Sequence, residues 1–278
     1  MEPIENRKNR RMSIQNRQVG AENPTTIFQI QKKDIISITG SGGKTTLLFC
    51  LAAELRKRGS VLLTTSTKIA VPQSGFDFLY TSLSAYQDAA KAKKAEIFAE
   101  TGLTDVSLKN VASSLWGNTV TCLGGKVPGI AKLTTVGYKA LHRICSDFDY
   151  CLIEADGSRR LPLKFWKAYE PVIYDFSTKA IGILPIKVYG KVPSEDFIYN
   201  FEGYQAYIGQ EPVNGQTIAQ LLAYPEGLFK NFFGPRYIFI NQVETEEDFK
   251  HFNEVQSAFR GTEKLIYGSA KEGIFYEN

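Results

Sequence analysis

The feature that most constrains the fold lies between residues 34 and 65, where an apolar strand, a glycine-rich loop, an amphipathic helix and a second apolar strand follow one another. Residues 34–39 (DIISIT) are short and β-branched, as in a strand buried on both faces of a parallel sheet. Residues 44–58 place leucines and an alanine on one helical stripe, and Gly59 follows where a helix favours a left-handed residue. With the strand at residues 61–65, the pattern predicts a right-handed βαβ unit.

The alternation of strands and helices continues along the chain. Further helices are expected at residues 85–100, 135–146, 216–223 and 246–259, and further strands at residues 76–81, 119–123, 149–154, 179–184, 237–241 and 264–268. Residues 101–118 and 185–215 are irregular, and we interpret them as insertions that could form a lid or a subdomain. The chain is therefore predicted to be a three-layer α/β protein with a mainly parallel sheet.

Composition excludes several classes of protein. A chain of 278 residues with 43% hydrophobic and 22% charged residues can bury an ordinary globular core. No apolar run approaches the roughly 20 residues that span a bilayer, and the N-terminus lacks the apolar stretch of a signal peptide. We therefore expect a cytoplasmic protein with no membrane segment. Four cysteines without C-x-x-C spacing predict free thiols, and two histidines exclude a histidine-rich metal chaperone.

The net charge of +4 is concentrated at the N-terminus. Residues 1–33 contain seven basic and three acidic residues, so the remaining chain is balanced. A basic leader could contact nucleic acid or an acidic partner, but a solvated extension is the favoured interpretation. We therefore divide the chain into a basic, flexible leader at residues 1–24 and a single α/β domain at residues 25–278, and we do not expect nucleic acid as a partner.

The loop at residues 38–46 (ITGSGGKTT) joins the first strand to the first helix. It resembles the phosphate-binding pattern G-x-x-x-x-G-K-[ST], except that Ile38 occupies the position of the first glycine. At such a junction, backbone N–H groups and the positive helix end favour an anion. The alternative is a tight turn with an exposed lysine, but the coincidence of strand, glycines, Lys-Thr and amphipathic helix favours nucleotide binding. We interpret Ile38 as the last strand residue, before a shorter loop.

Each residue type in this loop has a role in the interpretation. Glycines let the backbone approach phosphate oxygens where a Cβ would clash. Lys44 would contact the β- and γ-phosphates of ATP or GTP, and the Thr45 hydroxyl would bind Mg²⁺. The expected nucleotide ligands in the loop are Gly40, Ser41, Gly42, Gly43, Lys44, Thr45 and Thr46.

A carboxylate-containing turn, EADGSRR, follows the strand at residues 149–154. A magnesium–nucleotide site needs carboxylates from a strand beside the loop, and Glu154 and Asp156 could supply them. Arg159 and Arg160 could neutralise phosphate or an anionic substrate. A solvated turn is the alternative, but the buried strand before it favours a metal-binding or catalytic role.

Hydroxyl groups follow the second strand at residues 64–68 (TTSTK). At the carboxyl edge of an α/β sheet they could contact a γ-phosphate or Mg²⁺. They could equally satisfy the backbone of the next turn. Thr65, Thr67 and Lys68 are the candidates, and Lys68 is the strongest of them.

Two late stretches bear on the nucleotide base. Residues 241–244 (NQVE) follow a strand where GTPases carry N-K-x-D, and residues 269–271 (SAK) follow the last strand, where they carry S-A-K. The extra methylene of Glu244, relative to aspartate, would shift a guanine base. Asn241 is therefore a candidate nucleotide ligand, and both ATP and GTP remain open.

Three stretches together resemble one family. GSGGKTT, VLLTTSTKI followed by Pro72, and LIEADGSRRLPLKFWKAYEPVI (residues 152–173) are similar to the selenium-dependent hydroxylase accessory proteins, the YqeC family. The resemblance covers roughly residues 25–270 and is most specific in EADGSRRLPLK. The sequence departs from the family pattern at Ser66 and Glu244, and it lacks a His-Arg pair expected near residues 199–200.

The resemblance implies an accessory role in the maturation of selenium-dependent molybdenum hydroxylases, with a hydroxylase or its cofactor-inserting machinery as partner. It also implies that the residues after the second strand line the same pocket as the loop, and that the EADGSRR turn acts opposite the loop. Lys164 and Glu170 match the family pattern without a role that the residues themselves suggest.

We therefore expect a P-loop NTPase-like domain that binds ATP or GTP with Mg²⁺ and hydrolyses it or transfers its phosphoryl group. The candidate metal ligands are Thr45, Glu154 and Asp156, and the candidate catalytic residues are Lys44, Glu154, Asp156 and Arg159. One alternative is a non-catalytic binder of a nucleotide-bearing cofactor such as a molybdopterin dinucleotide. Another is an ATP-dependent ligase similar to the Mur ligases, although this chain is short for their three domains.

Overall fold

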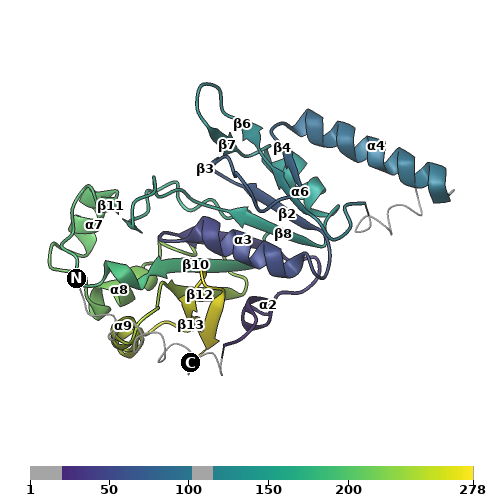
Figure 1. The fold of residues 1–278 in the computed structure, drawn as a ribbon. Helices are drawn as coiled ribbons and strands as arrows, with labels where there is room; N and C mark the ends of the chain where they lie inside the picture. Colours follow the sequence, from purple (N-terminus) through teal and green to yellow (C-terminus); the bar gives the residue numbers. More distant parts are fainter. Residues whose placement is uncertain (1–20, 102–114, 278) are drawn as a thin grey trace, which may run out of the picture.

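A nine-stranded sheet forms the centre of the protein in this computed structural model, which describes residues 21–101 and 115–277 (Figure 1). Its strands, in spatial order, are β14 (Ile274–Glu277), β13 (Lys264–Ser269), β12 (Arg236–Asn241), β10 (Lys179–Pro185), β1 (Ile35–Gly40), β8 (Tyr150–Glu154), β2 (Val61–Thr65), β5 (Val120–Leu123) and β4 (Phe78–Tyr80). Every neighbouring pair is parallel except β13 and β14. The strand that leads into the glycine loop, β1, therefore lies between β10 and β8.

Two smaller sheets lie beyond the carboxyl ends of the parallel strands. One is antiparallel and consists of β3 (Lys68–Ala70), β7 (Lys132–Thr134) and β6 (Gly125–Lys126). The other pairs β9 (Leu163–Lys164) with β11 (Ile198–Tyr199). In Figure 1 the sheet of β3, β7 and β6 is near the top, at the height of β4, and β11 is at the left of the picture.

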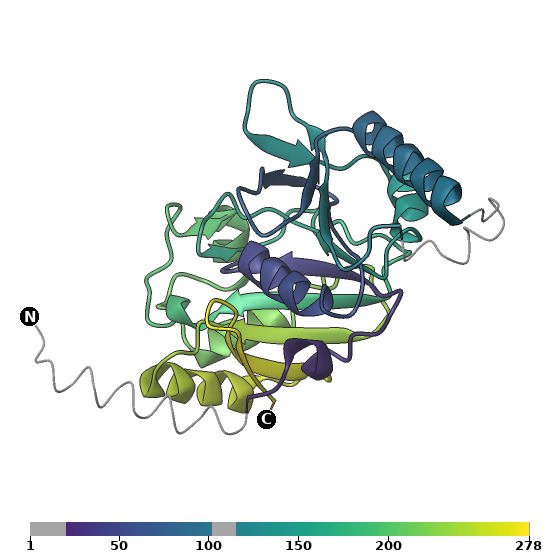
Figure 2. The ribbon, with the colours of Figure 1, turned by 45° about the vertical axis from the view of Figure 1, so that its right-hand side comes forward.

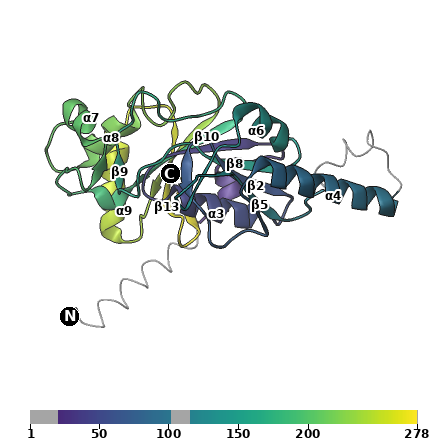
Figure 3. The same ribbon diagram turned by 90° about the horizontal axis from the view of Figure 1, so that it is seen from above.

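The helices of the described residues are α2 (Pro24–Ile27), α3 (Lys44–Leu55), α4 (Leu83–Thr101), α6 (Tyr138–Cys145), α7 (Phe201–Tyr207), α8 (Gly215–Leu222) and α9 (Glu246–Ala258), with a 3₁₀ turn, η3 (Ile186–Val188). Helix α4 packs on the sheet edge through Tyr86 and Ala90 and then extends away from the rest of the protein (Figure 3). Within residues 21–101 and 115–277, no helix has both the length and the apolarity that crossing a bilayer requires.

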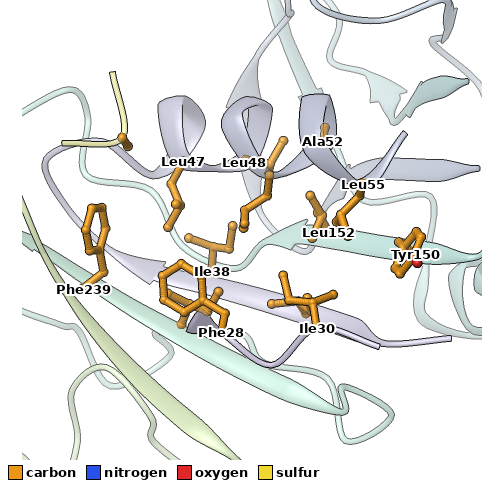
Figure 4. Packing of buried hydrophobic residues seen from close by; sticks show 14 of the residues in the cluster. Phe28, Ile30, Ile38, Leu47, Leu48, Ala52, Leu55, Tyr150, Leu152 and Phe239 are labelled. Carbon is orange, nitrogen blue, oxygen red and sulfur yellow. The ribbon is translucent and has the colours of Figure 1, made fainter. Parts of the chain in front are cut away.

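Helix α3 packs across one face of the sheet because its leucines lie on one stripe (Figure 2). Leu47, Leu48 and Leu55 are buried against strand side chains that include Ile38 and Leu152 (Figure 4). The short helix α2 packs beside α3 and closes the same face. This contact fixes the position of the first turn of α3, where the glycine loop ends.

Alternate residues of the same strands face the opposite side, where two further apolar clusters form. Helices α8 and α9 cover one half of the sheet and bury Leu184, Ile238 and Leu265. Helices α4 and α6 cover the other half and bury Leu62 and Ile153. The sheet is therefore the middle of three layers, and the mixed α/β class with a mostly parallel sheet is confirmed.

Most predicted elements are present, with small shifts at their ends. Strand β1 continues to Gly40, so Ile38 lies inside the strand and is not its last residue. All four cysteines are free thiols, as expected; Cys122, Cys145 and Cys151 are buried. Residues 1–20 of the expected leader and residues 102–114 of the first insertion lie outside the described residues. At the described start, the backbone N–H of Glu22 donates to the carbonyl of Phe275.

The second expected insertion, residues 185–215, contains η3, β11 and α7. Its apolar side chains, including Ile186, Val188 and Tyr204, pack in the cluster under α8 and α9. The sequence did not predict the shortest elements, since a segment of two to four residues is too short to show a hydrophobic periodicity. These elements are α2, β3, β6, β7, β9, β11 and β14. Some of them also pair with strands far away in the chain, as the register of Ile198 with Leu163 and of Lys68 with Thr134 shows.

The packing of Ile38 generates a testable prediction. Ile38→Ala should lower the free energy of unfolding by about 2–5 kcal/mol, because the Ile38 side chain is 0% exposed where β1 packs against α3. Ile130→Ala is the matched control: Ile130 is 48% exposed, and its loss should cost less than about 0.5 kcal/mol. Urea unfolding followed by circular dichroism measures both. Equal losses in the two variants would contradict the placement of Ile38 in the core.

Candidate functional site

The glycine loop between β1 and α3 packs tightly against the end of β10. Gly40, Gly42 and Gly43 have φ angles of +97°, +74° and +129°, which L-residues rarely adopt. A Cβ at Gly40 would lie 2.1 Å from the carbonyl oxygen of Ile183, and one at Gly42 would lie 2.2 Å from Cγ of Pro185. The loop therefore needs glycine for its own packing as well as for any approach of a phosphate.

Lys44 begins α3, and its ammonium group is held by the loop and by the turn after β8. The side chain is 5% exposed. Its Nζ donates to the carbonyl of Gly40 at 2.5 Å and lies 3.2 Å from Oδ1 of Asp156. Lys44 nevertheless contributes to the lining of a cavity beside the loop. Its charge is thus fixed in place at the floor of that cavity.

Asp156 is fully buried, and one oxygen of its carboxylate, Oδ2, is surrounded by donors. Oδ2 accepts from the backbone N–H of Gly40 and from Nε1 of Trp166, both at 3.0 Å, and lies 3.2 Å from Nζ of Lys164. Oδ1 faces Lys44, and Asp156 is not among the residues that line the cavity. Asp156 therefore ties the loop to the turn after β8. Its Oδ1 accepts no hydrogen bond from the residues that the structure describes, and the expected role of Asp156 in binding Mg²⁺ or in catalysis stays a prediction.

Lys164 completes this buried group of charges. It is 0% exposed, donates to the carbonyl of Gly157 at 2.9 Å, and lies 3.3 Å from Oε2 of Glu170. Lys164 and Glu170 had no role that the sequence suggested, and the structure makes both of them partners of the Asp156 cluster. One sequence signal could have revealed that Lys164 is buried: it lies between Leu163 and Phe165, in a run too apolar for a solvated side chain.

Glu154 faces the first turn of α3. The hydroxyl of Thr45 donates to Oε2 of Glu154 at 2.9 Å, and both residues line the cavity. Burial raises the pKa of the Glu154 carboxyl above its ordinary value, and the charge of Asp156 acts in the same direction. Lys44 and the Thr45 hydrogen bond oppose the increase. A hydroxyl and a carboxylate, both hard oxygen donors, thus meet at the head of the helix.

Asn241 joins the loop to the turn after β13. Its Nδ2 donates to the carbonyl of Gly42 at 2.8 Å, and its Oδ1 accepts from the N–H of Ala270 at 2.9 Å. The Ser269 hydroxyl donates to Oε1 of Glu244 at 2.9 Å, so the two late stretches lie together beside the loop. Asn241 is not one of the residues that line the cavity, which indicates that it positions the loop.

A cavity of about 950 Å³ opens beside the loop. Its walls come from the loop, the β3–β7–β6 sheet, the turn after β8, the segment after β10 and Gln242. Glu154 is the one acidic residue among the lining residues that the structure describes. The basic lining residues are Lys44, Lys68, Lys132, Arg159, Arg160, Lys187 and Lys191. The cavity is therefore strongly cationic.

The cavity brings together part of the expected site. The expected residues that line it are Gly42, Gly43, Lys44, Thr45, Thr46, Lys68, Glu154 and Arg159. Thr65 and Thr67 do not line it: the Thr65 hydroxyl donates to the carbonyl of Glu154 and accepts from the N–H of Thr67. Gly40 and Ser41 are buried behind the loop surface. Lys132, Lys187 and Lys191 were not expected, because no motif marks them: Lys132 begins the short strand β7, and the other two lie in the second insertion.

The buried charge group predicts a stability effect. Lys164→Met should lower the free energy of unfolding by about 3–5 kcal/mol, because it leaves Asp156 and Glu170 buried without their shared counter-ion. Lys57→Met is the control: Lys57 is exposed and pairs with Glu54, and its loss should cost less than about 1 kcal/mol. Chemical denaturation measures both variants. A loss of no more than 1 kcal/mol in Lys164→Met would contradict the importance of the buried group.

The raised pKa of Glu154 predicts a pH dependence in the protein without metal or nucleotide. Because the folded protein keeps the Glu154 proton at pH values where the unfolded chain has lost it, the wild type loses stability as pH rises from the ordinary glutamate pKa through the raised value. Glutamine cannot ionise. The melting temperature of Glu154→Gln minus that of the wild type should therefore be near zero at about pH 4 and grow as pH rises.

A control with the opposite sign lies in the same helix. The hydrogen bond from Lys57 lowers the pKa of Glu54, so the stability that Glu54 contributes is present above its ordinary pKa and lost as pH falls. Glu54→Gln minus wild type should consequently become negative as pH rises. Thermal unfolding in EDTA between about pH 4 and pH 8 measures both series. The same trend in both would contradict the burial of the Glu154 charge as the cause.

Comparison with known proteins agrees with the sequence resemblance. The family described as YqeC protein matches residues 36–202, which include the loop, β8 and the Asp156–Lys164 pair. A protein of Escherichia coli (strain K12), named Uncharacterized protein YqeC, is 30% identical over 205 residues, covering 72% of this chain and 72% of that protein. No solved structure matches the chain. The chain therefore belongs to the YqeC family.

Proposed function

We propose that this protein binds a nucleoside triphosphate with Mg²⁺ through the loop at residues 40–46, as P-loop NTPases do, and hydrolyses it or transfers its γ-phosphoryl group. The observation that carries the proposal is the hydrogen bond between Thr45 at the head of α3 and Glu154 at the end of the adjacent parallel strand. A P-loop site combines these two elements in this arrangement. The glycine conformations and the cationic cavity support the same function.

The residues present fit a magnesium ion better than a transition metal. No group of three or more His, Cys, Asp or Glu side chains gathers into a metal-binding cluster among the described residues. Mg²⁺ does not need such a group, because it takes one or two protein oxygens together with phosphate oxygens and water. Thr45 and Glu154, which line the cavity, would hold it directly, and Asp156, which does not line the cavity, would act through Lys44. Mg²⁺ would supply charge neutralisation between the β- and γ-phosphates.

The chain's own groups would then have distinct roles. The backbone N–H groups at the start of α3 and the Lys44 ammonium would bind the phosphates. Asp156 would hold Lys44 and the N–H of Gly40 in fixed positions, and so acts on the site through them. Arg159, which is exposed and lines the cavity, would contact the group that accepts the phosphoryl. The hydrogen bond between Ser269 and Glu244 brings together the two stretches that could contact a nucleotide base. Both ATP and GTP therefore remain candidate ligands.

The accessory role in hydroxylase maturation is part of this proposal and derives from the sequence resemblance. Its partner would be a molybdenum hydroxylase or the machinery that inserts its cofactor. A non-catalytic binder of a nucleotide-bearing cofactor could use the same loop. Release of inorganic phosphate from Mg·ATP or Mg·GTP separates the two functions. Turnover by the wild-type protein supports an NTPase. Tight binding of the nucleotide without turnover, with or without the proposed partner present, supports a non-catalytic binder.

A pair of substitutions at Thr45 tests the proposed metal and nucleotide site. Thr45→Val keeps the shape of the side chain but removes the hydroxyl, and should weaken Mg²⁺-dependent binding of the nucleotide by about tenfold or more. Thr45→Ser keeps the hydroxyl and should remain within about threefold of the wild type. The measurement is the thermal shift with ATP, GTP and their diphosphates, with Mg²⁺ or EDTA. No shift with any nucleotide in the wild type would overturn the proposal.

A further inference from the structure

The cavity contains more positive charge than the loop requires. Lys44 and Lys187 are paired with carboxylates, at 3.2 Å to Asp156 and 2.6 Å to Asp248. The other basic lining residues have no ion pair with any carboxylate in the described part of the chain; we call them the cationic wall: Lys68, Lys132, Arg159, Arg160 and Lys191. Like charges gathered without counter-ions repel one another and favour an anionic ligand.

The two arginines lie in an unfavourable backbone conformation. The N–H of Leu161 donates to the carbonyl of Ser158 at 2.9 Å, and Arg159 and Arg160 between them have φ angles of +52° and +66°. Positive φ at both central positions is the signature of a type I′ turn, which normally carries Asn-Gly or Gly-Gly. Two arginines in these positions cost conformational free energy, and such costs are concentrated at ligand-binding sites.

The arginine side chains are available to a ligand. Arg159 lies over the ring of Tyr199, with its guanidinium carbon 5.4 Å from the ring centre. Stacking of this kind uses the face of the guanidinium and leaves its N–H edges free. Both arginines are exposed and line the cavity. Paired guanidinium groups are suited to the bidentate recognition of a phosphate.

Two of the three lysines of the wall, Lys68 and Lys132, come from the small antiparallel sheet. The antiparallel register sets Ala70 opposite Lys132, and Lys68 lies two residues from Ala70 on the same strand. Lys68 and Lys132 therefore project from the same face of that sheet, as diagonal neighbours of like sign. Like charges at these diagonal positions repel each other, and an anion shared between the two ammonium groups would relieve the repulsion.

We propose that the cationic wall is a second anion site, which binds the phosphate group of a phosphorylated small molecule beside the nucleotide at the loop. This inference rests on the proposed function for the identity of the first ligand. The cavity volume of about 950 Å³ lies at the upper end of the roughly 300–1,000 Å³ found for pockets of drug-sized ligands, so the inference rests on the charges of the wall and the strained arginine turn. The second ligand would be the co-substrate of the proposed phosphoryl transfer, held by the turn that follows the Glu154 strand. One of its oxygens would form the new bond to the γ-phosphorus, with any proton on that oxygen released to water, while the bond from the γ-phosphorus to the bridging oxygen breaks and the nucleoside diphosphate leaves.

The test compares Arg159→Gln/Arg160→Gln with Lys94→Gln/Lys139→Gln. The control removes two charges from exposed lysines of α4 and α6, neither of which lines the cavity. The probes are inorganic phosphate and ribose 5-phosphate, with ribose as the uncharged control. Binding is measured by calorimetry at low ionic strength, with the loop saturated by the Mg²⁺ complex of a non-hydrolysable ATP or GTP analogue and without it.

We expect the arginine variant to bind the phosphate probes at least about tenfold more weakly than the wild type. Its affinity for the nucleotide analogue should stay within about threefold of the wild type. The lysine control should match the wild type for both kinds of ligand. If the analogue binds none of the proteins but phosphate binding still depends on the arginines, the proposed nucleotide function fails and the second site stands. If the analogue is weakened as much as the probes, the arginines belong to the nucleotide site. That result, or phosphate binding that is absent or equal in all three proteins, would overturn the inference.

Discussion

The ion pair between Asp156 and Lys44 connects the two halves of the site. The carboxylate lies where the turn after β8 meets the glycine loop, and it binds the loop twice, through the Lys44 ammonium and the N–H of Gly40. A buried carboxylate is tolerated only with strong partners, because its desolvation costs several kcal/mol. Lys164 supplies the second positive charge and brings Glu170 with it. The loop, the turn and β9 are therefore held as one unit.

This buried group of charges is electrically balanced, so it positions the loop without adding net charge to the site. Lys44 and Lys164 face the two carboxylates Asp156 and Glu170, so their charges largely cancel inside the protein. The loop consequently contributes geometry and oriented N–H groups more than net charge. The attraction for an anion comes from the unpaired lysines and arginines at the cavity wall. Rigid positioning and electrostatic attraction are thus provided by different residues.

The parallel sheet explains why distant segments meet at this place. Strands β1, β8, β10 and β12 run in the same direction, so their carboxyl ends lie along one edge. The glycine loop follows β1, and Glu154, Pro185 and Asn241 are the last residues of β8, β10 and β12. Ligands of open α/β sheets bind at this edge because side chains from several strands converge there. The two outer layers, α3 on one face and α8 and α9 on the other, keep the strands and hence the site in register.

The sequence by itself determined the α/β class, the order of the long elements and the candidate residues of the loop, Lys68 and the EADGSRR turn. These are local signals, because periodicity and glycine or hydroxyl spacing act over a few residues. Only the tertiary structure decided that Asp156 is enclosed by two lysines, that Thr65 and Thr67 support a turn, and that Lys132 and Lys191 face the cavity. Burial and pairing arise between segments up to more than a hundred residues apart, and no local pattern encodes such distances.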